Sequence, residues 1–218
     1  MPEISHEDVT CPHCGAQASF TIYPYIDAVR EQELKMNCLN GKVFEFICPA
    51  CGQMSHIGYP LCYHDSEQHL MMQVINERDP LVCAGVMMLR QMEYGADQPE
   101  LYTYRAVPTP AHLAEKVDIF SCCLDDRTVE LQKHLMLPAV RQKHEDAHAM
   151  LLRIFENELI YAVINKAGQV VASIPFDRAA YDELHGKCAP FYPEDGIDNM
   201  YVDTQWAEEY FTPATQLQ

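Results

Sequence analysis

The segments Cys11-Pro12-His13-Cys14-Gly15 and Cys48-Pro49-Ala50-Cys51-Gly52 largely determine how this chain folds. Each has the pattern Cys-Pro-x-Cys-Gly, in which the proline fixes one φ angle and the glycine permits a positive φ. This pattern predicts a tight knuckle whose two sulfur atoms point to the same side. Four thiolates from two such knuckles suit the closed tetrahedral coordination of a structural zinc ion. The sequence therefore predicts one zinc ion per chain, held by Cys11, Cys14, Cys48 and Cys51.

The composition indicates a chain that buries a substantial core and keeps its thiols reduced. It has 218 residues, of which 48% are apolar, and ten cysteines; this length suits one domain or two small ones. Residues 1–30 lack the basic segment and apolar run of a signal peptide, and no apolar stretch approaches the length of a membrane span. We therefore expect a cytoplasmic protein without a membrane partner, in which paired Cys-x-x-Cys motifs bind metal rather than form disulfides.

The charge of the chain opposes binding to nucleic acid. The net charge is −17, and such a charge repels a phosphate backbone. The segment between the knuckles forms no basic patch either, because Arg30, Lys35 and Lys42 stand among more numerous acidic residues. The acidic residues near the C-terminus are expected to form a solvated surface, with a basic partner protein as the alternative.

The pattern around the knuckles predicts a zinc ribbon. Residues 43–47 and 55–59 are expected to form strands that enter and leave the second knuckle. After the first knuckle, residues 20–23 alternate as a strand does, and Pro24 is expected to end it. The insertion between the knuckles is long for a ribbon and is expected to contain a helix over residues 31–39.

The remainder of the chain predicts a mixed α+β fold. Strands are expected over 70–75 and 101–107, whereas 76–99 allow no assignment. Thr109-Pro110 and Asp125-Asp126 are expected to begin helices, and Pro138 with the polar run after it marks a boundary. Beyond this boundary we expect a three-stranded meander and then two helices, over the ranges 150–155, 159–164, 170–175, 177–186 and 206–211. The expected domains are therefore a zinc-binding domain over 1–140 and a small α+β unit over 141–218.

The motifs taken together resemble those of the bacterial and archaeal CpXC family, which is named for its paired Cys-Pro-x-Cys motifs. The resemblance rests on both knuckles, on Tyr59-Pro60-Leu61 with Tyr63-His64-Asp65, and on Leu124-Asp125-Asp126-Arg127. It covers about the first 140 residues, and less specifically the meander beyond them. It implies zinc at the four knuckle cysteines and no substrate, because the family has no characterised function.

Other residues compete weakly as metal ligands. His13 lies inside a knuckle, but four thiols already complete a tetrahedral site, so we expect it to face solvent. Six cysteines lie outside the knuckles: Cys38, Cys62, Cys83, Cys122, Cys123 and Cys188. We expect them to act as small buried apolar residues. Cys122 and Cys123 are neighbours on an expected helix, so they cannot both face one metal ion.

Two functions from different classes remain open. The first is a zinc-binding interaction module that binds an unidentified protein or a second copy of itself, without catalysis. The alternative is a hydrolase-like enzyme with a pocket around His64, Asp65, Asp125 and Arg127, in which the imidazole and a carboxylate act as acid and base. No nucleophile motif, phosphate-binding loop or His-Glu-x-x-His sequence accompanies them, so the sequence favours the interaction module. The methionines near Met71 and Met87 are expected to fill a core rather than line a binding groove.

Overall fold

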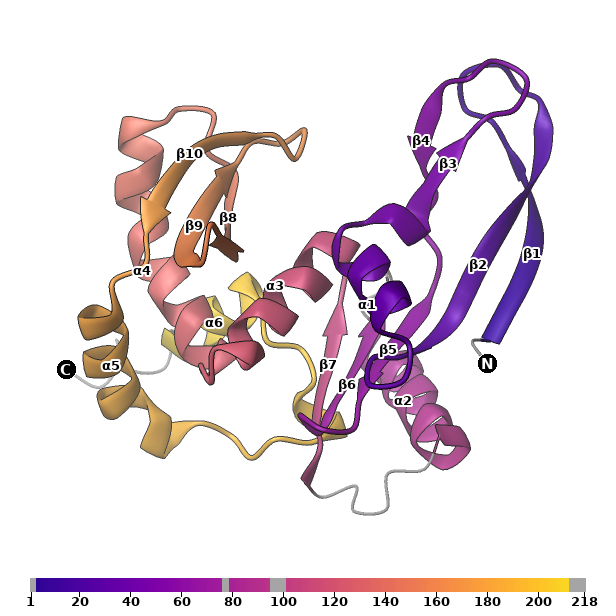
Figure 1. The fold of residues 1–218 in the computed structure, drawn as a ribbon. Coiled ribbons are helices and arrows are strands. Elements are labelled where there is room, and N and C mark those ends of the chain that lie inside the picture. The colour runs from indigo at the N-terminus through magenta and orange to yellow at the C-terminus, as the bar shows by residue number, and fades with distance from the viewer. Residues whose placement is uncertain (1–2, 76–78, 95–100, 212–218) are drawn as a thin grey trace. The chain divides into compact units, whose positions relative to one another are not determined.

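The computed structural model describes residues 3–75, 79–94 and 101–211, which contain six α-helices and three sheets (Figure 1). The expected α+β class is confirmed. The chain forms two compact units. Unit 1 comprises Met1–Leu113 with Asp195–Met200, and unit 2 comprises Ala114–Glu194 with Tyr201–Gln218.

This division falls inside helix α3 (Pro110–Ser121) and so differs from the boundary expected after residue 140. The reason lies in the core of unit 2. Ile119 of α3 and Val129 of helix α4 (Asp126–Lys143) pack in one cluster with Leu152 and Tyr161 of the C-terminal strands. Burial of these apolar side chains together groups both helices with the C-terminal residues.

Unit 1 is built on a five-stranded sheet. Its strands are β1 (Glu3–Thr10), β2 (Gln17–Asp27), β5 (Leu61–Asp65), β6 (Leu70–Val74) and β7 (Thr103–Val107), in that spatial order. The β2–β5 and β6–β7 pairs are parallel, and the other two pairs are antiparallel. Every residue of β5 and β6 is buried, as expected for strands covered on both faces.

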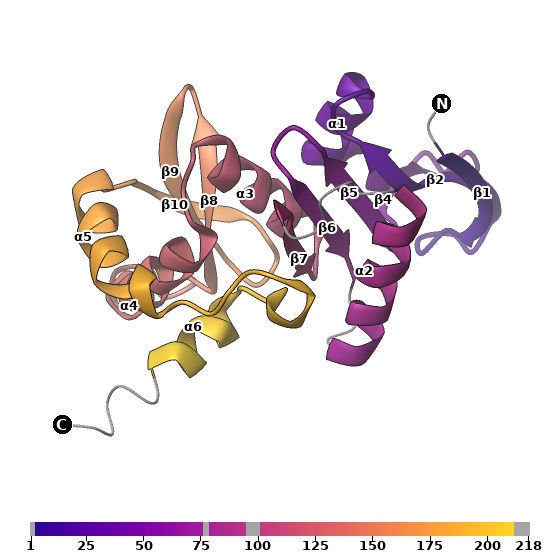
Figure 2. The same ribbon diagram turned by 90° about the horizontal axis from the view of Figure 1, so that it is seen from below.

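The connection from β2 to β5 carries the second knuckle. It contains α1 (Gln32–Leu39), a 3₁₀ turn (Lys42–Phe44), and the hairpin of β3 (Glu45–Ile47) and β4 (Met54–His56). Gly41 follows α1 with a φ of 77°, the left-handed conformation that glycine adopts at helix ends. The connection from β6 to β7 is α2 (Pro80–Tyr94). Figure 2 shows α1 and α2 on opposite sides of the sheet.

In unit 1, one strand was not predicted from the sequence and the end of another was misplaced. Strand β1 was missed, because its sequence is largely polar and it lies at the edge of the sheet, where a strand needs no apolar face. Strand β2 does not end at Pro24 but continues to Asp27. The ladder to β1 shifts register opposite Pro24, and a proline is tolerated at such an irregularity because no ladder bond is lost.

Helix α2 occupies Pro80–Tyr94, within the range 76–99 for which the sequence allowed no assignment. Met71, Met72 and Met87 are fully buried, so their role in the core is confirmed. The same expectation was wrong for Met88 and Met92, which are exposed on this helix because they lie on a different side of it from Met87.

Unit 2 contains the expected antiparallel meander of β8 (Ala149–Phe155), β9 (Glu158–Ile164) and β10 (Val170–Pro175). Helix α4 contacts β8 and the two later helices, α5 (Arg178–Cys188) and α6 (Thr204–Phe211). Short 3₁₀ turns over Ala189–Phe191 in unit 2 and Ile197–Asn199 in unit 1 complete the described structure.

Pro138 was expected to mark a boundary, but α4 continues through this residue to Lys143. Pro138 is exposed, whereas Val140 beyond it is buried in the core of unit 2. Burial of the last turn therefore outweighs the cost of a proline inside the helix.

Candidate metal centre

The two knuckles have the same backbone geometry. In the first, Cys11 N–H donates to Ala16 O (2.9 Å) and Gly15 N–H donates to Cys11 O (3.0 Å). In the second, Cys48 N–H donates to Gln53 O (3.0 Å) and Gly52 N–H donates to Cys48 O (2.8 Å). Gly15 and Gly52 have φ angles of 74° and 70°, which a residue with a Cβ rarely adopts. The sequence thus specified both turns.

The structure brings the four knuckle sulfur atoms together. All four lie within 4.8 Å of one another. The Cys11–Cys51 pair is 3.8 Å apart and the Cys14–Cys48 pair 3.7 Å. A tetrahedral ion with metal–sulfur bonds of about 2.3 Å places its ligand atoms roughly 3.8 Å apart. The donor set and its spacing therefore fit a four-coordinate metal ion.

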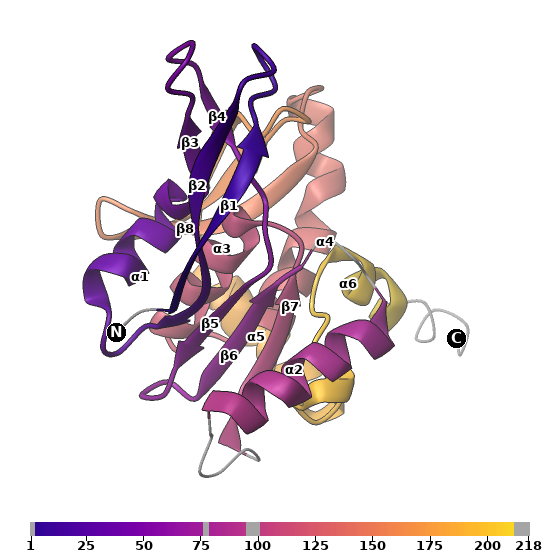
Figure 3. The ribbon, with the colours of Figure 1, turned by 90° about the vertical axis from the view of Figure 1, so that its right-hand side faces the viewer.

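Two hairpins hold the site, and an aromatic cluster fixes them to each other. The first knuckle joins β1 to β2, the second joins β3 to β4, and both turns lie at one end of unit 1 (Figure 3). The rings of Phe20 and Phe46 meet edge to face with centroids 6.0 Å apart, and Phe20 also contacts Tyr59 at 6.1 Å. Cys11 and Cys48 are buried in the same cluster. The core beneath the site therefore positions one sulfur of each knuckle.

The protonation of the four thiols is coupled. Burial acts to raise the pKa of Cys48, but the backbone N–H groups of Cys51 and Ala50 and neighbouring thiols outweigh it, so the pKa falls to about 7. For Cys51, the Gln53 N–H favours the thiolate, yet desolvation and the nearby sulfur atoms raise the pKa to about 12. Four adjacent thiols thus do not all ionise by themselves. A bound cation would remove this obstacle, because it stabilises every thiolate.

The remaining cysteines and His13 lie outside the cluster. Cys38, Cys62 and Cys83 are fully buried, as expected, and burial raises the pKa of Cys38 to about 12. The prediction was wrong for Cys123, which is exposed, and Cys122 and Cys188 are only partly buried. Cys122 and Cys123 lie in the turn that follows α3 rather than on a helix. His13 is exposed.

The model of the family described as CpXC protein matches residues 9–133. This span contains both knuckles and more than half of the chain. The chain belongs to the CpXC family. No match was found among curated proteins or among solved structures.

The CpXC match also spans the four residues of the hypothetical hydrolase pocket, and the structure divides them between the two units. His64 and Asp65 lie on β5 in unit 1, whereas Asp125 and Arg127 lie at the start of α4 in unit 2. Within unit 1, Asp65 forms an ion pair with Lys35 (3.1 Å) and accepts a bond from Gln68 N–H (3.1 Å). Asp65 thus locks a turn and ties α1 to the sheet.

His64 is buried between two tyrosine hydroxyl groups. Its Nδ1 lies 2.7 Å from Tyr25 Oη and its Nε2 lies 2.9 Å from Tyr102 Oη. Burial lowers the pKa of His64, and the nearby carboxylates of Asp27 and Asp65 oppose this only in part. The neutral imidazole therefore bridges β2, β5 and the residue preceding β7.

This environment predicts a loss of stability in acid. The pKa of His64 is lower in the folded chain than its ordinary value of 6.5, so the unfolded chain binds the proton more readily. The free energy of unfolding should fall as the pH drops below about 6.5, down to the folded-state pKa. We expect the melting temperature of the natural chain to fall more between neutral and mildly acidic pH than that of His64→Gln. Equal pH dependence of the two melting curves would contradict this assignment, and metal loss in acid affects both proteins alike.

Asp125 and Arg127 form a structural pair in unit 2. Asp125 begins α4 as its N-cap and accepts a bond from Arg127 N–H at 2.9 Å. The Arg127 guanidinium donates to both carboxylate oxygens, at 2.9 and 2.7 Å, and to Pro193 O at 2.9 Å. It also lies 4.9 Å from the centre of the Tyr192 ring. These contacts join the start of α4 to the segment after α5.

Sequence reasoning missed a cluster of buried charges between α3 and α4. Lys133 Nζ lies 2.9 Å from both Glu115 Oε1 and Glu130 Oε1, and Lys116 Nζ lies 2.8 Å from Asp126 Oδ2. All five side chains are buried, and Leu152 N–H donates to Glu115 at 2.7 Å. Burial raises the pKa of Glu115, while the two carboxylates outweigh burial and raise that of Lys133.

Proposed function

We propose that this CpXC protein binds one structural zinc ion at Cys11, Cys14, Cys48 and Cys51, and that its zinc ribbon acts as an interaction module. The observation that carries the proposal is the approach of four sulfur atoms from two matched knuckles to within 4.8 Å. A set of four thiolates in tetrahedral arrangement is typical of zinc or of an iron–sulfur centre. Zinc is proposed because four-cysteine sites of this kind are widely used to stabilise small β units.

A structural role is supported by the completeness of the ligand set. Four protein ligands fill a tetrahedral zinc ion, whereas catalytic zinc keeps one position for water or substrate. The hairpins that carry the ligands have a small apolar core, whose cluster contains four buried residues, two of them the ligands Cys11 and Cys48. Metal binding would therefore supply stability that this core lacks.

The proposal of an interaction module rests on charge and on the distribution of polar residues. The net charge of −17 disfavours nucleic acid. The residues of the hydrolase hypothesis are used in ion pairs, caps and tyrosine contacts within two separate units, and no contact among the described residues favours catalysis. None of the described helices is long and apolar enough to cross a membrane. A reducing compartment such as the cytoplasm would keep the four knuckle thiols available for metal.

Chelation tests the structural role. Removing the metal with a strong chelator should lower the melting temperature by more than about 10 °C, because the loss of several kcal/mol shifts melting by roughly 2–4 °C per kcal/mol in a chain of this size. Adding zinc back should restore it. Melting curves that coincide with and without chelator, in protein verified to have lost its metal, would contradict a structural site.

A further inference from the structure

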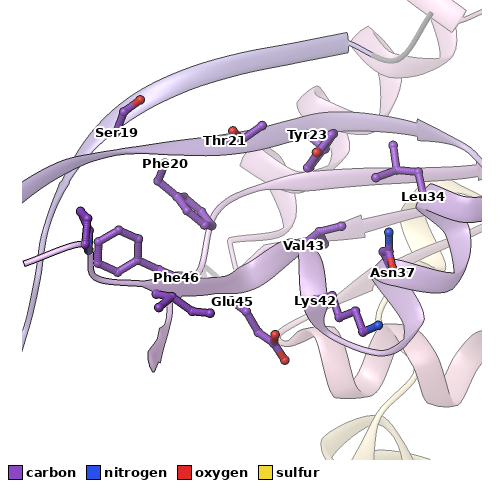
Figure 4. A pocket seen from close by; sticks show the side chains of 12 residues that line it. Ser19, Phe20, Thr21, Tyr23, Leu34, Asn37, Lys42, Val43, Glu45 and Phe46 are labelled. Atoms are coloured by element: carbon purple, nitrogen blue, oxygen red, sulfur yellow. The ribbon is translucent and has the colours of Figure 1, made fainter. Parts of the chain in front are cut away.

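A groove of about 520 Å³ lies beside the aromatic cluster in unit 1 (Figure 4). One wall is formed by β2, through Ser19, Phe20, Thr21 and Tyr23. The facing wall is formed by the 3₁₀ turn and β3, through Lys42, Val43, Glu45, Phe46 and Ile47. Phe20 and Phe46 reach toward each other from the two walls. Their rings therefore hold β2 and β3 apart, and the two strands do not pair with each other.

The edge of β2 that borders this groove has open backbone groups. Cys11 N–H donates to Ala16 O at the start of the β1–β2 ladder. In an antiparallel ladder every second pair of opposite residues is hydrogen-bonded, so Ala18 and every second residue after it on β2 bond to β1. Ser19 and Thr21 lie between these bonded positions, so their backbone N–H and C=O groups point away from β1. The 3.3 Å contact of Thr21 Oγ1 with His6 Nδ1 agrees, because side chains approach closely in a non-bonded pair. Strand β5 pairs with β2 only from Tyr25 onward.

The edge of β3 is open in the same sense. Ile57 N–H donates to Phe44 O, and Cys48 N–H donates to Gln53 O. Because every second residue of β3 bonds to β4, these two bonds place Phe46 among the bonded positions. Glu45 and Ile47 direct their backbone groups toward the edge of β3 that faces away from β4. The Glu45 N–H closes the 3₁₀ turn onto Lys42 O. The Glu45 C=O and both backbone groups of Ile47 remain open, and no third strand joins β3 and β4 among the described residues.

We propose that this groove, here called the ribbon groove, binds an extended peptide segment of a partner protein, which pairs as a strand with the open edge of β2. Ser19 and Thr21 are two residues apart, which is the spacing at which a neighbouring strand exchanges bonds. This inference rests on the proposed interaction module and names the class of ligand that the module binds.

Charge selects the kind of peptide. Lys42 and Glu45 line the wall opposite β2, and neither side chain has a hydrogen bond or ion pair within the described structure. A bound strand with an acidic residue near Lys42 and a basic residue near Glu45 would satisfy both. The chain is itself strongly acidic, so electrostatics favours a neutral or basic partner over a second copy. The backbone edge gives affinity to any extended peptide, and these side chains give specificity.

A selection from a random dodecapeptide library, displayed on phage and exposed to the zinc-loaded full chain, tests the proposal. We expect enrichment of extended peptides that carry a basic residue. On binding, the amide protons of Ser19, Thr21 and Ile47 should exchange more slowly with deuterium. Thr21→Pro removes an open N–H without removing a ladder bond, and should weaken binding about tenfold or more. The matched control is Ser19→Ala, which keeps the backbone edge and should bind normally.

Three outcomes would overturn the proposal. One is the absence of any enriched peptide from protein that holds its metal and melts normally, a result that leaves the zinc site standing. Another is a selected peptide that slows exchange elsewhere and not at these three amides. The third is protection of these amides from exchange that increases with protein concentration when no peptide is present. That result would assign the groove to a second copy of the chain. If Thr21→Pro fails to fold, Glu45→Lys replaces it and should reverse the preference for basic peptides.

Discussion

Replacing Cys48 with serine should abolish tight metal binding and so remove most of the stabilisation that the ion supplies, which for a structural zinc site is on the order of 10 kcal/mol. Cys48 is fully buried, its backbone N–H closes the second knuckle, and its sulfur lies 3.7 Å from that of Cys14. A serine hydroxyl is a poor ligand for zinc beside three thiolates, and its burial without a partner adds to the cost. Thermal unfolding and metal analysis of the purified variant measure both effects.

Cys38→Ala is the control for this variant. Cys38 is also fully buried but lies outside the cluster, so its replacement should cost about 1 kcal/mol for the lost volume and leave the metal content unchanged. If Cys48→Ser retained one metal ion and melted like Cys38→Ala, the knuckles would not form the site described here.

Replacing Lys133 with methionine should destabilise the chain by about 3–5 kcal/mol, because it leaves the buried Glu115 carboxylate without its ion-pair partner. Glu130 keeps only the longer contact with Lys116, at 3.3 Å. Glu130 Oε2 already has no hydrogen-bond partner among the described residues, so the cluster has no spare hydrogen bond at this atom to offset the loss of Lys133. The protein has a single tryptophan, Trp206 in α6, so urea unfolding followed by fluorescence reports on unit 2.

Lys187→Met is the matched control, since Lys187 forms an ion pair with Glu183 on the surface of α5 with 70% of each side chain exposed. Such an exposed pair is screened by solvent and contributes little to stability. Adding Glu115→Gln to Lys133→Met should recover part of the loss, because it removes the buried carboxylate that Lys133→Met leaves without a cation, whereas Glu130 keeps Lys116. Equal destabilisation by the two lysine variants would refute the account of the buried cluster.

The knuckles were predictable from sequence because their geometry is local. Proline, glycine and two thiols within five residues fix the turn whatever surrounds it, and both turns formed as expected. The same is true of the C-terminal meander, where apolar alternation and the turn before Gly168 specify the hairpin.

The errors arose where distant residues decide local structure. Pro24 was expected to end a strand and Pro138 to mark a boundary, but a register shift accommodates the first proline and burial of Val140 outweighs the cost of the second. The edge strand β1 has no apolar pattern of its own and forms only because β2 supplies a partner. The cluster of Lys116, Lys133 and their carboxylates depends on how α3 packs against α4, which no periodicity encodes.

The most direct test of the central claim is the metal content of the full chain, purified without added metal and measured by elemental analysis against the protein concentration. The account predicts one zinc ion per chain, and none in Cys48→Ser. Protein that folds normally with no metal would contradict the claim, and iron in place of zinc would contradict the identity of the ion.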